Sequence, residues 1–167
     1  MAEANGWTLY EHPALTAQLA KLEAIVERRR ADDPDGYAHS ADAKLLAAIV
    51  KLTMAIIPAD PNAKPFRQGS TLGNRRKHWF RAKFGNGRYR LFYQFNLRAR
   101  IIIYAWVNDE ETLRTYGSRT DAYAVFRSML DAGHPPDRWD ALLKVARTDE
   151  APSAKAPGKA KKRQRGS

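Results

Sequence analysis

The sequence predicts an α+β fold: a short strand and two helices, then an antiparallel hairpin, a third strand and further helices. Two observations predict it. Apolar residues recur every three or four positions up to about residue 57, and alternate with polar ones after residue 78. The pair Asn86-Gly87 lies within the alternating region. Asn-Gly is the strongest short-range hairpin signal, because both central residues of a type I′ turn need a positive φ.

The first half of the chain is expected to contain a strand over residues 6–10 and two amphipathic helices. Residues 13–30 form the first helix, because their leucines keep helical spacing and a proline suits the first turn. Ser40 caps the second helix and Pro58 stops it. Residues 58–74, rich in proline and glycine, are expected to form a loop. The predicted buried stripe of the second helix is Leu45, Leu46, Ile49, Leu52, Ile56 and Ile57.

The hairpin strands are expected over residues 78–84 and 88–95. A two-residue turn pairs Phe84 with Tyr89, and this register separates the side chains by type. A slip of one residue would mix the two sets. One face carries Phe80, Ala82, Phe84, Tyr89, Leu91 and Tyr93, and the other carries Arg81, Lys83, Arg88 and Arg90.

The second half continues with a strand over residues 100–107, which is apolar on both faces, as expected at the centre of a sheet. Asn108, with Glu111 three residues later, predicts a capping box for a short helix that Gly117 stops. Two further helices are expected, one capped by Thr120 and ending at Gly133, and one opened by Pro135, Pro136 and Asp137.

The charge of the chain is +11, and its distribution points to a nucleic-acid partner. No acidic residue lies between Asp60 and Asp109, a stretch that holds eleven basic ones. Positive charges concentrated in this way repel one another unless an anion binds to them. Residues 151–167 carry six basic residues and no acid, and are expected to be a disordered basic tail on a domain that covers residues 1–150.

Several classes of protein are excluded by what the sequence lacks. There is no cysteine, so disulfides, thiolate ligands and a cysteine nucleophile are all absent. The four histidines lack the spacing of zinc sites, so no metal and no cofactor are expected. The N-terminus shows no signal-peptide pattern, and the longest apolar block, residues 45–50, is far shorter than the ~20 residues that span a bilayer. A cytoplasmic protein without membrane contact is expected.

The basic face of the hairpin is the candidate site. Lys83 opposite Arg90 is a like-charge pair, which is destabilising by itself. A solvated polar face is one interpretation. The lack of nearby acids and the interleaved aromatic side chains, Phe92 among them, favour single-stranded RNA, whose bases stack on such rings. The expected RNA-binding side chains are Arg75, Arg76, Lys77, Trp79, Arg88 and Trp106.

Four motifs of the sequence form a characteristic set: Asn5-Gly6-Trp7, Lys83-Phe84-Gly85-x-Gly87-Arg88-Tyr89-Arg90, Thr112-Leu113-Arg114-Thr115-Tyr116-Gly117 and Gly133-His134-Pro135-Pro136. With them, and over nearly all of residues 5–146, the chain resembles the YhaV toxins. The resemblance implies a RelE-like fold, a small antiparallel-dominated sheet with two N-terminal helices packed on one face and C-terminal helices. It also implies a ribonuclease that arrests translation and growth by cleaving mRNA, and an AbrB-like (PrlF-type) antitoxin partner.

Metal-free RNA cleavage needs a base for the 2′-hydroxyl, a cation for the phosphorane and an acid for the leaving oxygen. Lys83 is the candidate base, because like-charge repulsion from its neighbours favours its neutral form. Arg81 and Arg90 are assigned to the phosphate, which a planar guanidinium matches. Arg114 and Tyr116 are expected to close the site, Tyr116 by stacking a base or donating a proton, although both also suit an ordinary helix surface.

Two other functions stay open at this point. A non-catalytic module that binds RNA or the ribosome would have the same composition. A DNA-binding repressor fits less well, because the basic face lies on a sheet and no helix-turn-helix is apparent.

Overall fold

The computed structural model describes residues 1–110, 112 and 122–150. Within these residues, five strands form one sheet in the order β1-β2-β5-β4-β3. All neighbouring strands are antiparallel except β2 and β5, which are parallel, a pairing that the sequence pattern did not predict. The strands are β1 (Ala2–Ala4), β2 (Trp7–Glu11), β3 (Phe80–Phe84), β4 (Tyr89–Asn96) and β5 (Ile101–Val107).

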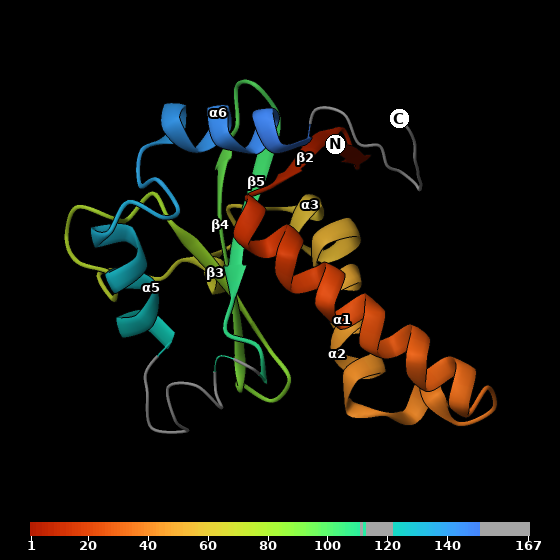
Figure 1. Cartoon of the computed structure of the whole chain (residues 1–167). Helices are drawn as coiled ribbons and strands as arrows, with labels where there is room; N and C mark the ends of the chain where they lie inside the picture. The colour runs from red at the N-terminus through yellow and green to blue at the C-terminus, as the bar shows by residue number, and fades with distance from the viewer. Residues whose placement is uncertain (111, 113–121, 151–167) are drawn as a thin grey trace.

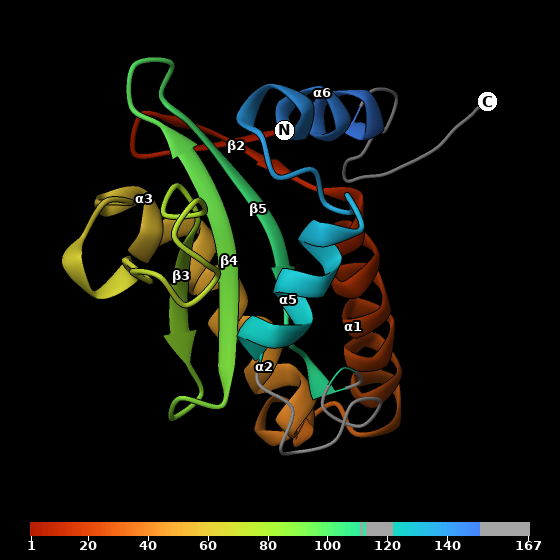
Figure 2. The same cartoon turned by 90° about the vertical axis from the view of Figure 1, so that its left-hand side faces the viewer.

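Helices cover both faces of this sheet. Figure 1 shows the N-terminal helices to one side of the strands and α5 to the other, with α6 across one end. Figure 2, turned by 90°, shows α5 in front of the sheet. The α+β class is confirmed. The helical elements are α1 (Pro13–Asp32), η1 (Tyr37–His39), α2 (Ala41–Lys51), the π-helical turn η2 (Leu52–Ile56), α3 (Ile57–Ala59), η3 (Lys64–Phe66), α5 (Ala122–Asp131) and α6 (Trp139–Glu150).

Each face of the sheet has its own hydrophobic core. The first core joins Leu15 and Leu22 of α1 to the apolar face of the hairpin. The second joins Phe126 of α5 and Leu142 of α6 to the opposite face, where Phe92 is buried. β5 contributes buried side chains to both cores, as expected of the central strand. The basic residues of the hairpin therefore share their face with a second core.

The cap predicted for the second helix is confirmed, and the first helix has a cap of its own. Ser40 Oγ accepts a hydrogen bond from the Ala43 amide at 3.2 Å and caps α2, as expected. His12 Nδ1 accepts from the Ala14 amide at 3.0 Å and caps α1, so this histidine is a capping side chain.

The expectation that Ile56 is buried was wrong, since it is 40% exposed. The wide turn of η2 shifts the helical phase, so that Leu52 and Ile57 take the core positions.

The hairpin register is confirmed. Phe84 pairs with Tyr89 and Lys83 with Arg90. Asn86 and Gly87 have φ of 58° and 81°, the left-handed values that the turn demands. A register shift between Phe92 and Tyr93 interrupts the pairing of β4 with β5, so that the ladder passes over one residue of β5.

No described helix is long and apolar enough to cross a lipid bilayer. The basic tail, residues 151–167, lies outside the described residues.

Candidate active site

Two arginines of the hairpin meet a tyrosine of α5 on the second face of the sheet. Arg81 Nε donates a hydrogen bond to Tyr123 Oη at 2.7 Å. The Arg90 guanidinium lies over the Tyr123 ring, with its Cζ 5.4 Å from the ring centroid. Arg81 and Arg90 come from neighbouring strands and point to the same face, because both precede an inward-facing residue of the first core. The structure thus brings together two of the predicted catalytic residues around a phenol.

The two arginines lower the pKa of Tyr123. Partial burial alone would raise that pKa, but hydrogen bonds from Arg81 and Arg90 and their positive charges outweigh it. Tyr89, on the opposite face of the hairpin, behaves in the opposite way. Burial and a hydrogen bond to Glu110 raise the pKa of Tyr89 to about 12. Of these two tyrosines, Tyr123 is therefore the one whose proton is easier to remove.

Arg90 is held in position through its own backbone. The Asn108 side chain is buried and clamps β4, accepting from the Arg90 amide at 2.6 Å and donating to the Arg88 carbonyl at 3.2 Å. Arg90 Nη1 donates to the Gly87 carbonyl at 2.8 Å. Arg90 Nε is buried and has no hydrogen-bond partner among the described residues. A buried donor of this kind is costly, because it has lost its contact with water without gaining an acceptor.

Arg81 is also tied to the fold. Its Nη1 donates to the Pro65 carbonyl at 2.7 Å, so the guanidinium bridges η3 and helix α5. Lys83 lies on the same face, opposite Arg90, with its side chain exposed. Arg75 and Lys77, two of the predicted RNA-binding residues, are exposed in the loop that leads to β3.

Arg76 and Arg88 already have carboxylate partners in the structure. Arg76 pairs with Asp131 at 2.8 Å and with Asp137 at 3.4 Å. Arg88 pairs with Glu110 at 3.0 Å. Basic residues of the acid-free stretch between Asp60 and Asp109 thus pair with acidic residues that lie outside it in the sequence.

The predicted stacking role of Trp79 and Trp106 is contradicted. Trp79 is fully buried and Trp106 is 6% exposed, and both rings pack on Phe126 of α5. The Trp79 Nε1 donates to Asp137 at 2.7 Å, which fixes the ring inside the protein. Phe92 is buried in the same cluster. Helix α5 covers this face, and no pattern within the hairpin itself reveals that.

The residue after Asn108, and not Asn108 itself, provides the cap that the sequence suggested. Asp109 Oδ1 accepts from the Thr112 amide at 2.9 Å and from its hydroxyl at 2.8 Å. Asn108 is occupied with β4 instead, so the predicted capping role of Asn108 was wrong. The other residues expected in this region, Glu111, Arg114, Tyr116, Gly117 and Thr120, lie outside the described residues.

Tyr123 is the site residue that the sequence interpretation missed. It lies on α5 three residues before Phe126 and seven before Leu130, both buried, so helical spacing indicates that it faces the sheet. Its pairing with Arg81 joins residues 42 positions apart. Local spacing cannot reveal a contact at that separation.

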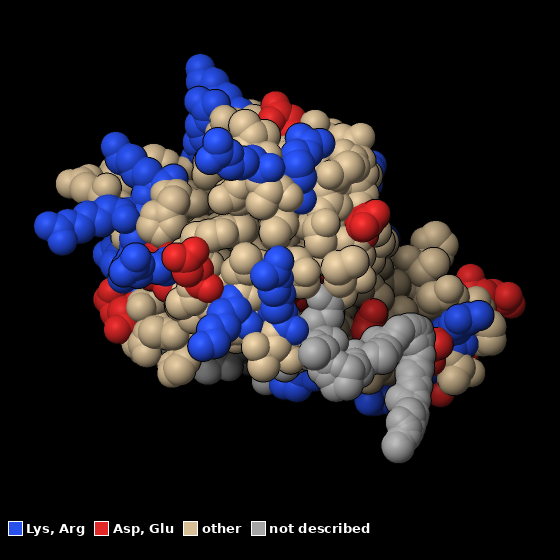
Figure 3. Space-filling model, turned by 90° about the horizontal axis from the view of Figure 1, so that it is seen from above, with Lys and Arg blue, Asp and Glu red and all other residues tan. Residues whose placement is uncertain are grey.

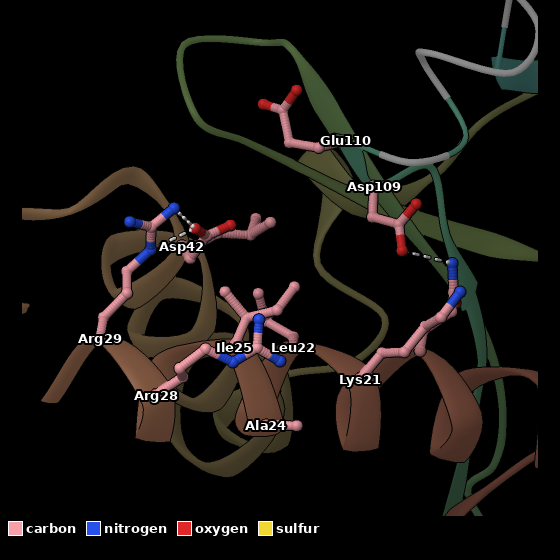
Figure 4. Close-up of a pocket in the computed structure, with 11 residues that line it drawn as sticks. Lys21, Leu22, Ala24, Ile25, Arg28, Arg29, Asp42, Asp109 and Glu110 are labelled. Carbon is pink, nitrogen blue, oxygen red and sulfur yellow. Dashed lines mark hydrogen bonds and ion pairs between the residues drawn. The ribbon is translucent and has the colours of Figure 1, made fainter. Parts of the chain in front are cut away.

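Charge and cavities alone do not locate this site. Figure 3 shows Lys and Arg side chains also spread over the end of the molecule that carries α6. A pocket of about 650 Å³ lies between α1, α2 and the end of β5 (Figure 4). It contains the Arg29–Asp42 ion pair at 2.7 Å and the Gln18–Asp109 hydrogen bond at 3.3 Å. None of the hairpin arginines is among its lining residues in the described part of the chain.

The structure also allows a test for metal ligands. In the described ranges, no three His, Asp or Glu side chains gather closely enough to hold a metal ion. His78 contacts a single carboxylate, that of Asp137, at 3.1 Å.

Comparisons with known proteins identify the family of the chain. The family model Toxin_YhaV, described as a toxin with endonuclease activity of a toxin–antitoxin system, matches residues 9–147. The chain is 46% identical over 141 residues to the ribonuclease toxin YhaV of Escherichia coli K12, covering 84% of this chain and 92% of that protein. It is 47% identical over 139 residues to toxin YhaV of Escherichia coli O6:H1, covering 83% and 90%. No solved structure matches the chain.

Proposed function

The chain belongs to the YhaV family of toxins, and we propose that it is a metal-independent endoribonuclease that cleaves mRNA and thereby inhibits translation and growth. The observation that carries the proposal is the Tyr123 hydroxyl, which accepts a hydrogen bond from Arg81 beside the Arg90 guanidinium. A phenol of lowered pKa next to two cations combines a proton donor with a phosphate-binding surface.

In the proposed reaction, the 2′-hydroxyl attacks the neighbouring phosphorus and the bond to the 5′-oxygen breaks. Arg81 and Arg90 stabilise the extra negative charge on the phosphorane. The position of the Arg90 guanidinium supports this assignment, because it lies over the Tyr123 ring beside the Arg81–Tyr123 hydrogen bond. Lys83, exposed on the same face, takes the proton of the 2′-hydroxyl. Tyr123 donates its proton to the leaving 5′-oxygen. The products are a 2′,3′-cyclic phosphate and a 5′-hydroxyl.

The finer features that the family resemblance implies are part of the proposal. They are a RelE-like fold of residues 1–150, a cytoplasmic site of action on RNA that is free or bound to the ribosome, and an AbrB-like (PrlF-type) antitoxin. A toxin of a toxin–antitoxin system has an antitoxin partner and, as a ribonuclease, an RNA substrate. The proposed AbrB-like type is supported by the resemblance alone. Arg114 and Tyr116 stay candidate site residues, outside the described part of the chain.

Chelation tests the metal-independent mechanism. Cleavage of a single-stranded RNA by the full-length protein should persist in excess EDTA, because the proposed acid, base and cations are all side chains. End-group analysis should find a 5′-hydroxyl opposite a 2′,3′-cyclic or 3′-phosphate. A 5′-phosphate end, or activity that EDTA removes and added Mg²⁺ restores, would show that a metal-activated water is the nucleophile instead.

A further inference from the structure

An exposed apolar stripe runs along the outer side of α2 and η2. Of the large hydrophobic side chains that are exposed in the described chain, three lie there: Val50 (50% exposed), Met54 (43%) and Ile56 (40%). Val50 and Met54 are four residues apart, with exposed Ala47 three residues before Val50, so they share one side of the helix. We call Ala47, Val50 and Met54 the outer stripe. Helix faces of this kind are typical of docking surfaces for another segment.

The charge around the outer stripe is positive. Lys44 and Lys51 are both exposed and, seven residues apart, lie along the same edge of the stripe, about 10 Å from each other at 1.5 Å per residue. The acidic residue of α2, Asp42, is engaged with Arg29 at 2.7 Å. A partner segment that carries carboxylates beside apolar side chains would complement this surface.

We propose that the outer stripe anchors the antitoxin and binds an acidic segment of it with one apolar side. Membership of a toxin–antitoxin family supplies the protein partner. A second copy of this chain fits less well, because it would bring Lys44 and Lys51 against an equally basic surface. RNA fits less well too, since the stripe has no aromatic ring on which a base could stack.

The outer stripe and the active site lie on opposite sides of the sheet. α2 packs in the first core, whereas Tyr123 of α5 packs against the second (Figure 1). Changes in the stripe should therefore affect antitoxin binding without affecting the arginines or Tyr123. The inference does not depend on RNA cleavage, since antitoxin binding is measured without RNA.

The test uses the full-length toxin and the purified antitoxin encoded beside its gene. The double substitution Val50→Glu/Met54→Glu should weaken binding at least about 30-fold, the effect expected where large side chains form the centre of an interface. Lys44→Glu/Lys51→Glu should also weaken binding, and its effect should shrink at high salt. Leu97→Glu is the matched control, because Leu97 is 65% exposed at the opposite end of β4 from the hairpin turn.

The stripe variants should keep full ribonuclease activity and become toxic even when the antitoxin is co-expressed. Unchanged affinity in both double variants would overturn the proposal. So would a change in the toxin's own oligomeric state, seen by light scattering, with antitoxin affinity intact, since the stripe would then bind a second copy. If the Glu pair lowers the melting temperature strongly, the lysine pair decides, because those side chains are exposed.

Discussion

Replacing Arg81 with alanine should abolish growth arrest by the toxin. Arg81 donates to Tyr123 Oη and, in the proposed reaction, stabilises the phosphorane together with Arg90. The loss of one such donor costs about 10²–10³ in rate. Growth after induction without antitoxin and single-turnover cleavage at saturating RNA both measure this effect. RNA binding should survive, because several other cations contribute to it.

The Arg81→Ala variant needs a thermal melt, because Arg81 also has a structural role. Its bond to the Pro65 carbonyl is lost as well, and together the missing hydrogen bonds should cost about 1–3 kcal/mol of stability. Arg98→Ala is the matched control, since Arg98 is an exposed arginine in the turn between β4 and β5. A folded Arg81→Ala protein that arrests growth as fully as wild type would refute the proposed site. RNA binding by the wild type without any cleavage would favour the binding-module alternative.

Tyr123→Phe should lower the cleavage rate by about 10²–10⁴-fold, the usual contribution of a general acid. Phenylalanine keeps the ring beside Phe92, whose centroid is 5.8 Å away, and removes the hydroxyl alone. Tyr37→Phe is the control, since Tyr37 lies in η1, outside the site.

The pH profile distinguishes an acid from a structural tyrosine. A general acid must be protonated, so kcat/KM should fall as the pH rises through the pKa of Tyr123. Because Arg81 and Arg90 lower that pKa, the fall should come at a lower pH than the ordinary tyrosine value of about 10 would give. The residual activity of Arg81→Lys should still show this fall. Tyr123→Phe should lose it, and a profile unchanged by Tyr123→Phe would exclude Tyr123 as the acid.

The hairpin could be predicted from the sequence because its determinants are local. The Asn86-Gly87 turn selects the register, and alternation of apolar and basic residues supports the same register over five consecutive pairs. The central position of β5 followed from its apolar character on both faces. Arg81, Lys83 and Arg90 were placed on one face for the same reason, and the structure has them there.

The contacts made by α5 and α6 could not be predicted in this way. Trp79 and Trp106 are of the residue type on which bases stack, but Phe126 covers both rings. Only the tertiary arrangement shows this packing. The acids that pair with Arg76 follow it in the chain by 55 and 61 positions. Ile56 was misplaced because a π-helical turn changes the helical period, which a regular pattern does not anticipate.

The central claim is that this chain cleaves RNA by attack of the substrate's own 2′-hydroxyl at a site of arginine, lysine and tyrosine side chains. Its most direct test is an RNA in which the nucleotide before a mapped cleavage position carries a 2′-deoxy sugar. We expect the full-length protein to bind this RNA as tightly as the all-ribose one and to leave that position uncut, while neighbouring sites are still cleaved. Cleavage at the deoxy position would exclude attack by the 2′-hydroxyl, because water would then be the nucleophile.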